Sequence, residues 1–157
     1  MTTRALILHY ADYRERSRML TMLTESGEKI SASAHGSKPY AEPFVCSELT
    51  LTRANNRWLV KEGRTVSEFR GIRAELEKFQ MAAYIAGVVN AIADSDAPQP
   101  DLFRFCARVF DTLSRLDLSV DGILDRFQTE FEHRAAVTAG FYSFDEIREL
   151  LSQREYW

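Results

Sequence analysis

Five short segments with the character of β-strands fill the first 70 residues of this chain. They are rich in threonine, valine, isoleucine and aromatic residues, with partial alternation of apolar and polar positions. Turn-forming pairs such as Ser26-Gly27 and Asn55-Asn56 separate them. Successive antiparallel strands favour a small closed barrel, because closure leaves no strand edge exposed. The segments are residues 4–10, 17–24, 29–34, 44–53 and 58–70.

The fourth segment illustrates the pattern. Val45, Leu49 and Leu51 occupy alternate positions and are expected to face the barrel interior. Ser47 lies on the same side and is the polar exception. The segment therefore predicts a strand with one buried face.

The apolar period then changes from that of a strand to that of a helix. The segment after Gln80 is apolar on nearly all sides, which predicts a buried central helix. Residues 94–100 form a cluster of turn residues before the next helix. The stripe of the first helix is expected to hold Ile72, Leu76, Phe79, Ala83, Ala86 and Val89, and that of the second Leu102, Cys106, Val109, Leu113 and Leu116.

A third helix is expected over residues 120–138, with Gly140 ending it. Its inward residues would be Ile123, Leu124, Phe127 and Phe131. The α+β fold class follows: an all-β barrel at residues 1–71 and an all-α bundle at residues 72–157.

The last helix has the clearest start signal. Ser143 and Glu146 have the spacing of a capping box. Tyr142 and Ile147 can form a hydrophobic staple across this box.

The two parts carry opposite charge. Residues 1–73 hold 12 Lys/Arg against 8 Asp/Glu, a net charge of +4, whereas residues 74–157 hold 8 against 15, a net charge of −7. This difference indicates that anion binding is confined to the first part, although acidic helix surfaces and chance could also produce it.

No motif for nucleotide binding, nucleophilic catalysis or zinc proteolysis occurs in the sequence, so no enzymatic activity is expected. His9, His35 and His133 fall on different elements, and zinc ligands usually come in closely spaced pairs, so we expect neither metal nor cofactor. Cys46 and Cys106 are expected to be buried free thiols in a reducing cytoplasm. No secretory leader is visible.

Nucleic-acid binding has more support. Arg14, Arg16 and Arg18 alternate along the chain, so in an extended segment their guanidinium groups would line one side. Aromatic residues nearby could stack on bases, as in other barrels that hold single strands. The alternative is that these charges only keep hairpin tips and loops hydrated. The further DNA-binding candidates are Arg4, Tyr13, Lys29, His35, Lys38, Tyr40, Arg53, Arg57, Lys61 and Arg64.

The stretch of residues 3–36 resembles the N-terminal domain of the RecO family of bacterial recombination mediators. The matching residues are Thr3, Arg4, Ala5, Leu8, Tyr13, Arg18, Leu20, Thr21, Leu23, Thr24, Gly27, Lys29, Ile30, Ala32, Ala34 and Gly36. Weaker matches follow in the family's order at Pro43-Phe44, residues 49–52, Arg73, Leu76, Tyr84, Ile85, Phe131, Arg134, Gly140 and Phe141.

The resemblance implies an oligonucleotide-binding (OB) barrel followed by a helical domain. It further implies a bacterial cytoplasmic protein, associated with the nucleoid, that binds single- and double-stranded DNA and anneals complementary strands. With RecR, such a protein loads RecA onto DNA coated by single-strand-binding protein. No bond is made or broken in this activity.

The resemblance also implies that the helical domain receives the acidic tail of single-strand-binding protein. The candidate contacts are Phe103, Arg104, Arg108 and Arg115, and Arg104 and Arg108 lie one helical turn apart. The alternative is that these are ordinary hydrated helix arginines.

Two features depart from the family's pattern. The basic run after the third strand is reduced to residues 35–40, which predicts a weaker hold on phosphate. No four-cysteine zinc module can follow Cys106, so we expect a compact natural form without zinc. A protein-interaction module with little DNA affinity, or an RNA-binding barrel, therefore remain alternatives.

Overall fold

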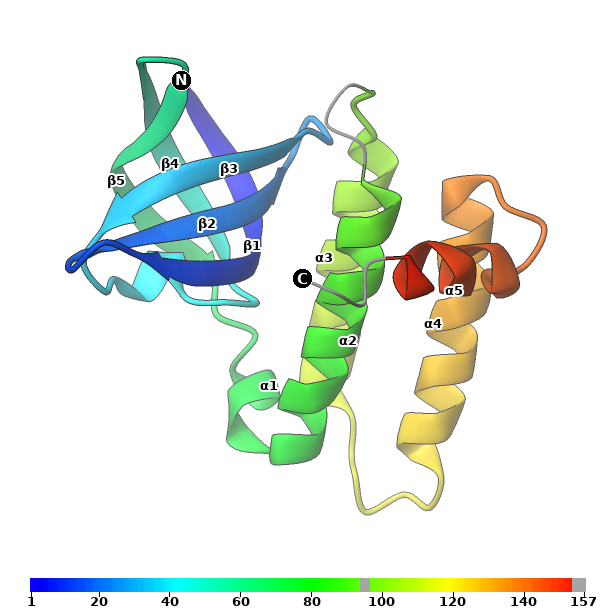
Figure 1. Cartoon of the computed structure of the whole chain (residues 1–157). Helices are drawn as coiled ribbons and strands as arrows, with labels where there is room; N and C mark the ends of the chain where they lie inside the picture. The colour runs from blue at the N-terminus through cyan, green and yellow to red at the C-terminus, as the bar shows by residue number, and fades with distance from the viewer. Residues whose placement is uncertain (94–96, 154–157) are drawn as a thin grey trace.

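The computed structural model describes residues 1–93 and 97–153, where a closed five-stranded barrel precedes a group of helices (Figure 1). The strand order around the barrel is β1-β2-β3-β5-β4, and β4 pairs with β1 to close it. This arrangement confirms the predicted α+β class with an OB-type barrel. The strands are β1 (Thr2–Tyr13), β2 (Ser17–Thr24), β3 (Lys29–His35), β4 (Cys46–Ala54) and β5 (Arg57–Ser67).

One pair of neighbouring strands in the barrel is parallel, and its two strands are distant in sequence. β3 runs parallel to β5, with Ser33 opposite Leu59, and the other neighbouring strands are antiparallel. β1 pairs with both β2 and β4, and an irregularity between Ile7 and His9 bends it. The bend allows one long strand to belong to both walls of the barrel.

The barrel interior is filled by small and medium-sized apolar side chains. Val45, Leu49 and Leu51 face inward as predicted. Ser47 is fully buried, and its hydroxyl donates a 2.7 Å hydrogen bond to the carbonyl of Tyr40. That bond explains how a polar side chain is tolerated there. The remaining members of this core are Ala5, Ile7, Leu20, Met22, Ile30, Ala32, Ala34 and Ala41.

The strand expected over residues 58–70 ends at Ser67, because Phe69 adopts a left-handed conformation with φ 46° and a helix begins at Arg70. Of the turn cluster predicted at residues 94–100, residues 94–96 lie outside the described part of the chain. The helices are α1 (Arg70–Ala74), α2 (Leu76–Ile92), α3 (Pro100–Arg115), α4 (Ile123–Ala139) and α5 (Phe144–Ser152), and a 3₁₀ turn, η1 (Pro39–Ala41), precedes β4.

α2 follows the predicted stripe only in part: Ala86 and Val89 are buried, as is Ile72 of α1. Leu76 is 67% exposed and Phe79 is 39% exposed. The prediction was wrong for these two residues and for the exposed Ala83, because Glu75 is extended and interrupts the helix between Ile72 and α2. The apolar residues of the buried side of α2 are Ala82, Ile85, Ala86, Val88, Val89, Ala91 and Ile92.

The ends of α4 and α5 follow the sequence signals in part. Gly140 ends α4 in a left-handed conformation, as predicted. Ser143 is the N-cap of α5, but its hydroxyl makes no capping bond, and Glu146 accepts a hydrogen bond from the backbone of Tyr142 instead. The predicted staple is wrong, because Tyr142 is fully exposed while Ile147 is buried.

Three helices converge on one carbonyl oxygen, that of Ser114 near the end of α3. The buried Lys78 of α2 donates a 3.2 Å hydrogen bond to this oxygen and pairs with Glu75 at 3.3 Å. Gly71 of α1 lies so close that a Cβ placed there would be 1.8 Å from the same oxygen. The close packing of α1, α2 and α3 therefore depends on a glycine at position 71 and on the buried ammonium group of Lys78.

The barrel and the helices share a core. Leu6, Leu8 and Leu23 on the outside of the barrel pack with buried residues of the helices. At the β2–β3 turn, the carbonyl of Gly27 accepts a 3.0 Å hydrogen bond from the backbone of Gln99. The barrel is therefore attached to the helices by packing as well as by the chain, and the boundary between residues 71 and 72 stays a prediction.

Cys46 and Cys106 are both buried and unbonded, as predicted. Burial raises the pKa of both thiols, which makes them poor nucleophiles. None of the described helices combines the length and apolar character needed to cross a bilayer.

Candidate nucleic-acid interface

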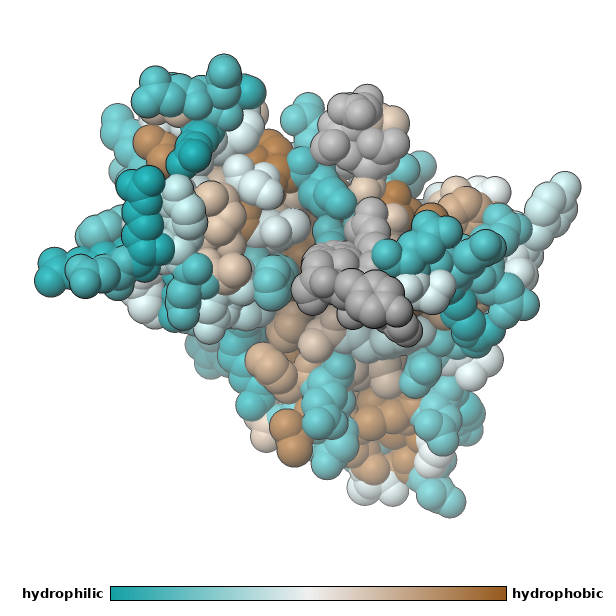
Figure 2. Space-filling view, viewed as in Figure 1, coloured by the Kyte–Doolittle hydropathy of each residue, from teal (hydrophilic) through white to brown (hydrophobic). Residues whose placement is uncertain are grey.

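The tip of the β1–β2 hairpin projects from the barrel as a hydrophilic extension (Figure 2, left). Residues 14–16 form its turn, and Arg14 has a left-handed φ of 61°. The prediction that Arg14, Arg16 and Arg18 share one face of an extended segment is therefore wrong, because a turn replaces the strand at the first two. Arg14 and Arg16 are exposed in the turn, whereas Arg18 belongs to β2.

Arg18 has a partly structural role. Its side chain is only 20% exposed, and its guanidinium lies 4.1 Å from the centre of the Tyr10 ring. It pairs with Asp12 at 3.8 Å and with Glu42 at 3.4 Å. Much of its charge is thus compensated within the protein.

The turn and the end of β3 surround an open depression beside the tip of the β1–β2 hairpin. Three of the predicted arginines and His35 meet there, although they do not form a single row. The described residues around the depression are Asp12, Arg14, Glu15, Arg16, Ser17, Arg18, His35, Gly36 and Ser37. The site is cationic, with two carboxylates at its border.

A hydrogen bond joins the two hairpins of the barrel. Arg57, at the start of β5, donates from Nη1 to the hydroxyl of Tyr13 at the end of β1, at 2.9 Å. The bond from Arg57 and the charge of Arg14 lower the pKa of the Tyr13 phenol. β1 and β5 are not neighbours in the strand order, so this bond connects two strands that do not pair with each other.

We call this region the hairpin face: the outer side of β2 and β3 with residues 13–18 and 53–59. It is the surface with which OB barrels generally bind oligonucleotides. Along its middle, Met19, Ser33 and Leu59 lie opposite one another on adjacent strands. Leu59 is 37% exposed. Sequence reasoning missed these residues, although strand alternation outward from Leu20 and Ala32 could have identified them.

Of three other candidates, Arg53 belongs to the hairpin face, and Lys38 and Lys61 follow its strands in sequence. Arg53 is exposed, and its guanidinium lies 5.1 Å from the centre of the Trp58 ring. Lys38 is exposed after the end of β3, and Lys61 is exposed on β5.

Four candidates lie elsewhere. Arg4 and Arg64 flank Glu48 on the β1–β4–β5 side of the barrel, and Arg64 pairs with that carboxylate at 3.1 Å. Lys29 donates a 3.1 Å hydrogen bond to the carbonyl of Asn90 on α2. The remaining candidate, the half-buried Tyr40, packs against Gly63. The structure does not bring these four to the hairpin face.

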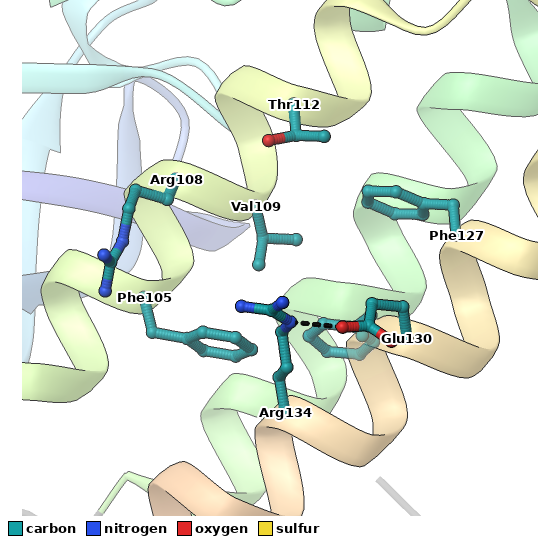
Figure 3. Close-up of a pocket in the computed structure, with 8 residues that line it drawn as sticks. Phe105, Arg108, Val109, Thr112, Phe127, Glu130 and Arg134 are labelled. Carbon is teal, nitrogen blue, oxygen red and sulfur yellow. Dashed lines mark hydrogen bonds and ion pairs between the residues drawn. The ribbon is translucent and has the colours of Figure 1, made fainter.

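The helical part contains a pocket between α3 and α4 (Figure 3). The stacked rings of Phe105 and Phe131, 5.8 Å apart, form part of its wall. Arg134 reaches across it and pairs with Glu130. Arg108 lies at its rim.

Only Arg108 among the candidates for the acidic tail lines this pocket. Arg104 pairs with Asp101, and Arg115 pairs with Asp111; both ion pairs lie within α3. Phe103 packs against the shared core. Sequence reasoning missed Arg134, which comes from another helix and carries no local signal.

Comparison with known proteins shows similarity over the barrel and into the helices. Residues 1–74 match the family model for the N-terminal part of recombination protein O. DNA repair protein RecO of Bacillus subtilis is 27% identical over 123 residues, which cover 74% of this chain and 47% of that protein. RecO of Desulforudis audaxviator is 27% identical over 146 residues, 88% of this chain and 56% of that protein.

The chain spans about half the length of these curated relatives. The match to the family model covers all five strands and α1. The longer of the two alignments extends beyond the barrel into the helices. In its barrel, and by a similarity that continues into the helices, the chain is similar to RecO proteins.

Proposed function

We propose that this chain binds single-stranded DNA on the hairpin face and acts, without catalysing a reaction, as a recombination mediator in DNA repair. The observation that carries the proposal is the bond between Tyr13 and Arg57, which joins the basic β1–β2 and β4–β5 hairpins. The similarity to RecO proteins supports the same conclusion. Duplex DNA would bind through the same cations.

The physical mechanism is capture of phosphates by exposed guanidinium groups. Arg14, Arg16 and Arg57 are exposed and can each neutralise one phosphate. The apolar middle of the face at Met19 and Leu59 offers a surface for bases. Contacts made chiefly to the backbone leave base edges free, which is what annealing of complementary strands requires.

The partners are proposed from the family. They are RecR, single-strand-binding protein and, indirectly, RecA. The pocket between α3 and α4 suits the acidic tail of single-strand-binding protein, because its aromatic walls would take apolar side chains and its arginines a carboxylate. Arg108 and Arg134 are the proposed contacts there.

A protein-interaction module with little DNA affinity is the rival function. It is favoured by the carboxylates at the hairpin: Asp12 and Glu42 compensate Arg18, and Glu15 lies in the turn. RNA binding is a third possibility, since backbone capture does not distinguish the two nucleic acids.

Binding of a labelled single strand at increasing salt separates these functions. Each phosphate contact adds about 0.7 to the slope of log affinity against log salt for single strands, so three arginines predict a slope of about −2. Fluorescence anisotropy measures this directly. Absence of binding at low salt would contradict the proposal, and tighter competition by single-stranded RNA would favour the third possibility.

A further inference from the structure

An apolar groove separates the barrel from α2. In Figure 2, apolar surface appears where the barrel meets the lower half of α2. The groove is bounded by β1, by the segment before β4 and by α2, and has a volume of about 370 Å³. That volume lies within the range of about 300–1,000 Å³ found for small-molecule sites. Its described lining is Leu8, His9, Tyr10, Pro43, Phe44, Phe79, Ala83, Ala86, Gly87 and Asn90.

Gly87 is the least expected residue of this lining. Glycine inside a helix is less stable than alanine by about 1 kcal/mol. A positive φ accounts for Gly27, Gly36, Gly122 and Gly140, and close neighbours account for Gly63 and Gly71. Neither applies to Gly87, whose added Cβ would meet nothing within 4 Å. The fold therefore gives no reason for its missing side chain, which leaves the floor of the groove open.

The walls of the groove are suited to a flat aromatic ligand. Phe79 is 39% exposed although it is a large apolar residue, and it packs edge-on against Phe44 with 5.2 Å between ring centres. Ala83 and Gly87 are both exposed and lie one turn apart on α2. Their small size leaves space in the groove between these two rings and β1. The exposed His9 adds a polar edge.

The groove adjoins the cationic depression of the hairpin face through one pair of contacting side chains. Tyr10 lines the groove, and the guanidinium that covers its ring belongs to Arg18, which lines the depression. A polyanion held in the depression would thus have an apolar, ring-lined recess directly beside it. This adjacency favours a nucleotide over an apolar protein segment as the occupant.

We propose that this groove takes an unstacked base of the bound single strand, with the ring placed over Gly87 and against Phe79. The proposal rests on DNA binding by the hairpin face. The base would leave the strand beside the depression, while the neighbouring phosphates stay on the arginines. Stacking of one base on an aromatic side chain typically changes affinity by about tenfold.

The test uses the full chain and a nine-nucleotide thymidine strand with one central 2-aminopurine. Gly87→Leu and Ala83→Leu each fill the groove from an exposed position. Gln80→Leu adds the same side chain to an exposed site on α2 outside the groove and serves as the control. We expect the two filling variants to lose about tenfold in affinity and at least half of the 2-aminopurine signal. The salt slope should be unchanged, because the phosphate contacts remain.

The outcomes distinguish the two proposals. If the wild type binds no strand, DNA binding itself is wrong. If the wild type binds with the expected salt slope but both filling variants retain its affinity and fluorescence change, the base pocket alone is wrong, and the groove is left for a protein contact. If Gln80→Leu loses as much affinity and fluorescence signal as the filling variants, the base pocket is also wrong, because a leucine anywhere on this part of α2 would then have the same effect.

Discussion

Gly71→Ala is expected to destabilise the protein by about 3 kcal/mol, at the upper end of what overpacking costs. Alanine is normally the better helix residue by about 1 kcal/mol, so propensity alone predicts the opposite sign. The new Cβ would lie 1.8 Å from the backbone oxygen of Ser114, and backbone cannot rotate away as a side chain can. Moving that oxygen would also weaken its bond with the buried Lys78.

Urea and thermal unfolding measure this effect. For a chain of this size, about 3 kcal/mol corresponds to a decrease in melting temperature of roughly 6–12 °C. Gly87→Ala is the matched control, because nothing lies within 4 Å of its added Cβ, and it is expected to be neutral or stabilising. Equal effects of the two substitutions would contradict the packing described for α1 and α3.

Arg14→Glu combined with Arg16→Glu is expected to reduce affinity for single-stranded DNA by at least about tenfold at low salt. One unit-charge contact at 4 Å contributes about 1 kcal/mol in water, and each reversal replaces an attraction by a repulsion. Even after screening by salt, the free-energy loss summed over the two reversals exceeds the 1.4 kcal/mol that corresponds to a tenfold change in affinity. The salt slope should become shallower by about 1.4, from two lost contacts.

Arg18 is left unchanged in this variant, since a carboxylate there would face Asp12 and Glu42 and disturb the barrel. Arg70→Glu combined with Arg126→Glu changes the net charge equally on the helices. Both arginines lie in the first turn of a helix, where a carboxylate is tolerated. If this control loses as much affinity as the hairpin variant, binding depends on overall charge and not on the hairpin face.

Much of the fold was predictable because its signals are local. Strand alternation and turn residues were sufficient for the five strands, and Gly140 marked the end of α4. The closure of the barrel was inferred only from the general cost of exposed edges. The parallel pairing of β3 with β5 depends on contacts about 26 residues apart in sequence, such as Ser33 with Leu59, which no local pattern encodes.

The site was predictable in composition but not in geometry. Alternation of Arg14, Arg16 and Arg18 suggested a strand, whereas the chain turns there and leaves only Arg18 in β2. The bond between Tyr13 and Arg57 joins residues separated by 44 positions. Lys29 carries a charge of the right sign but contacts α2. Composition indicates which residues can bind phosphate, and only the fold determines which of them share a surface.

The central claim is that single-stranded DNA binds on the hairpin face. Titration of the ¹⁵N-labelled chain with a short thymidine strand, followed by backbone amide shifts, tests it most directly. The largest shifts are expected at residues 13–18, 35–38 and 53–59, with small changes in α4. Saturable binding whose largest shifts fall on α3 and α4, with the barrel unaffected, would contradict the claim.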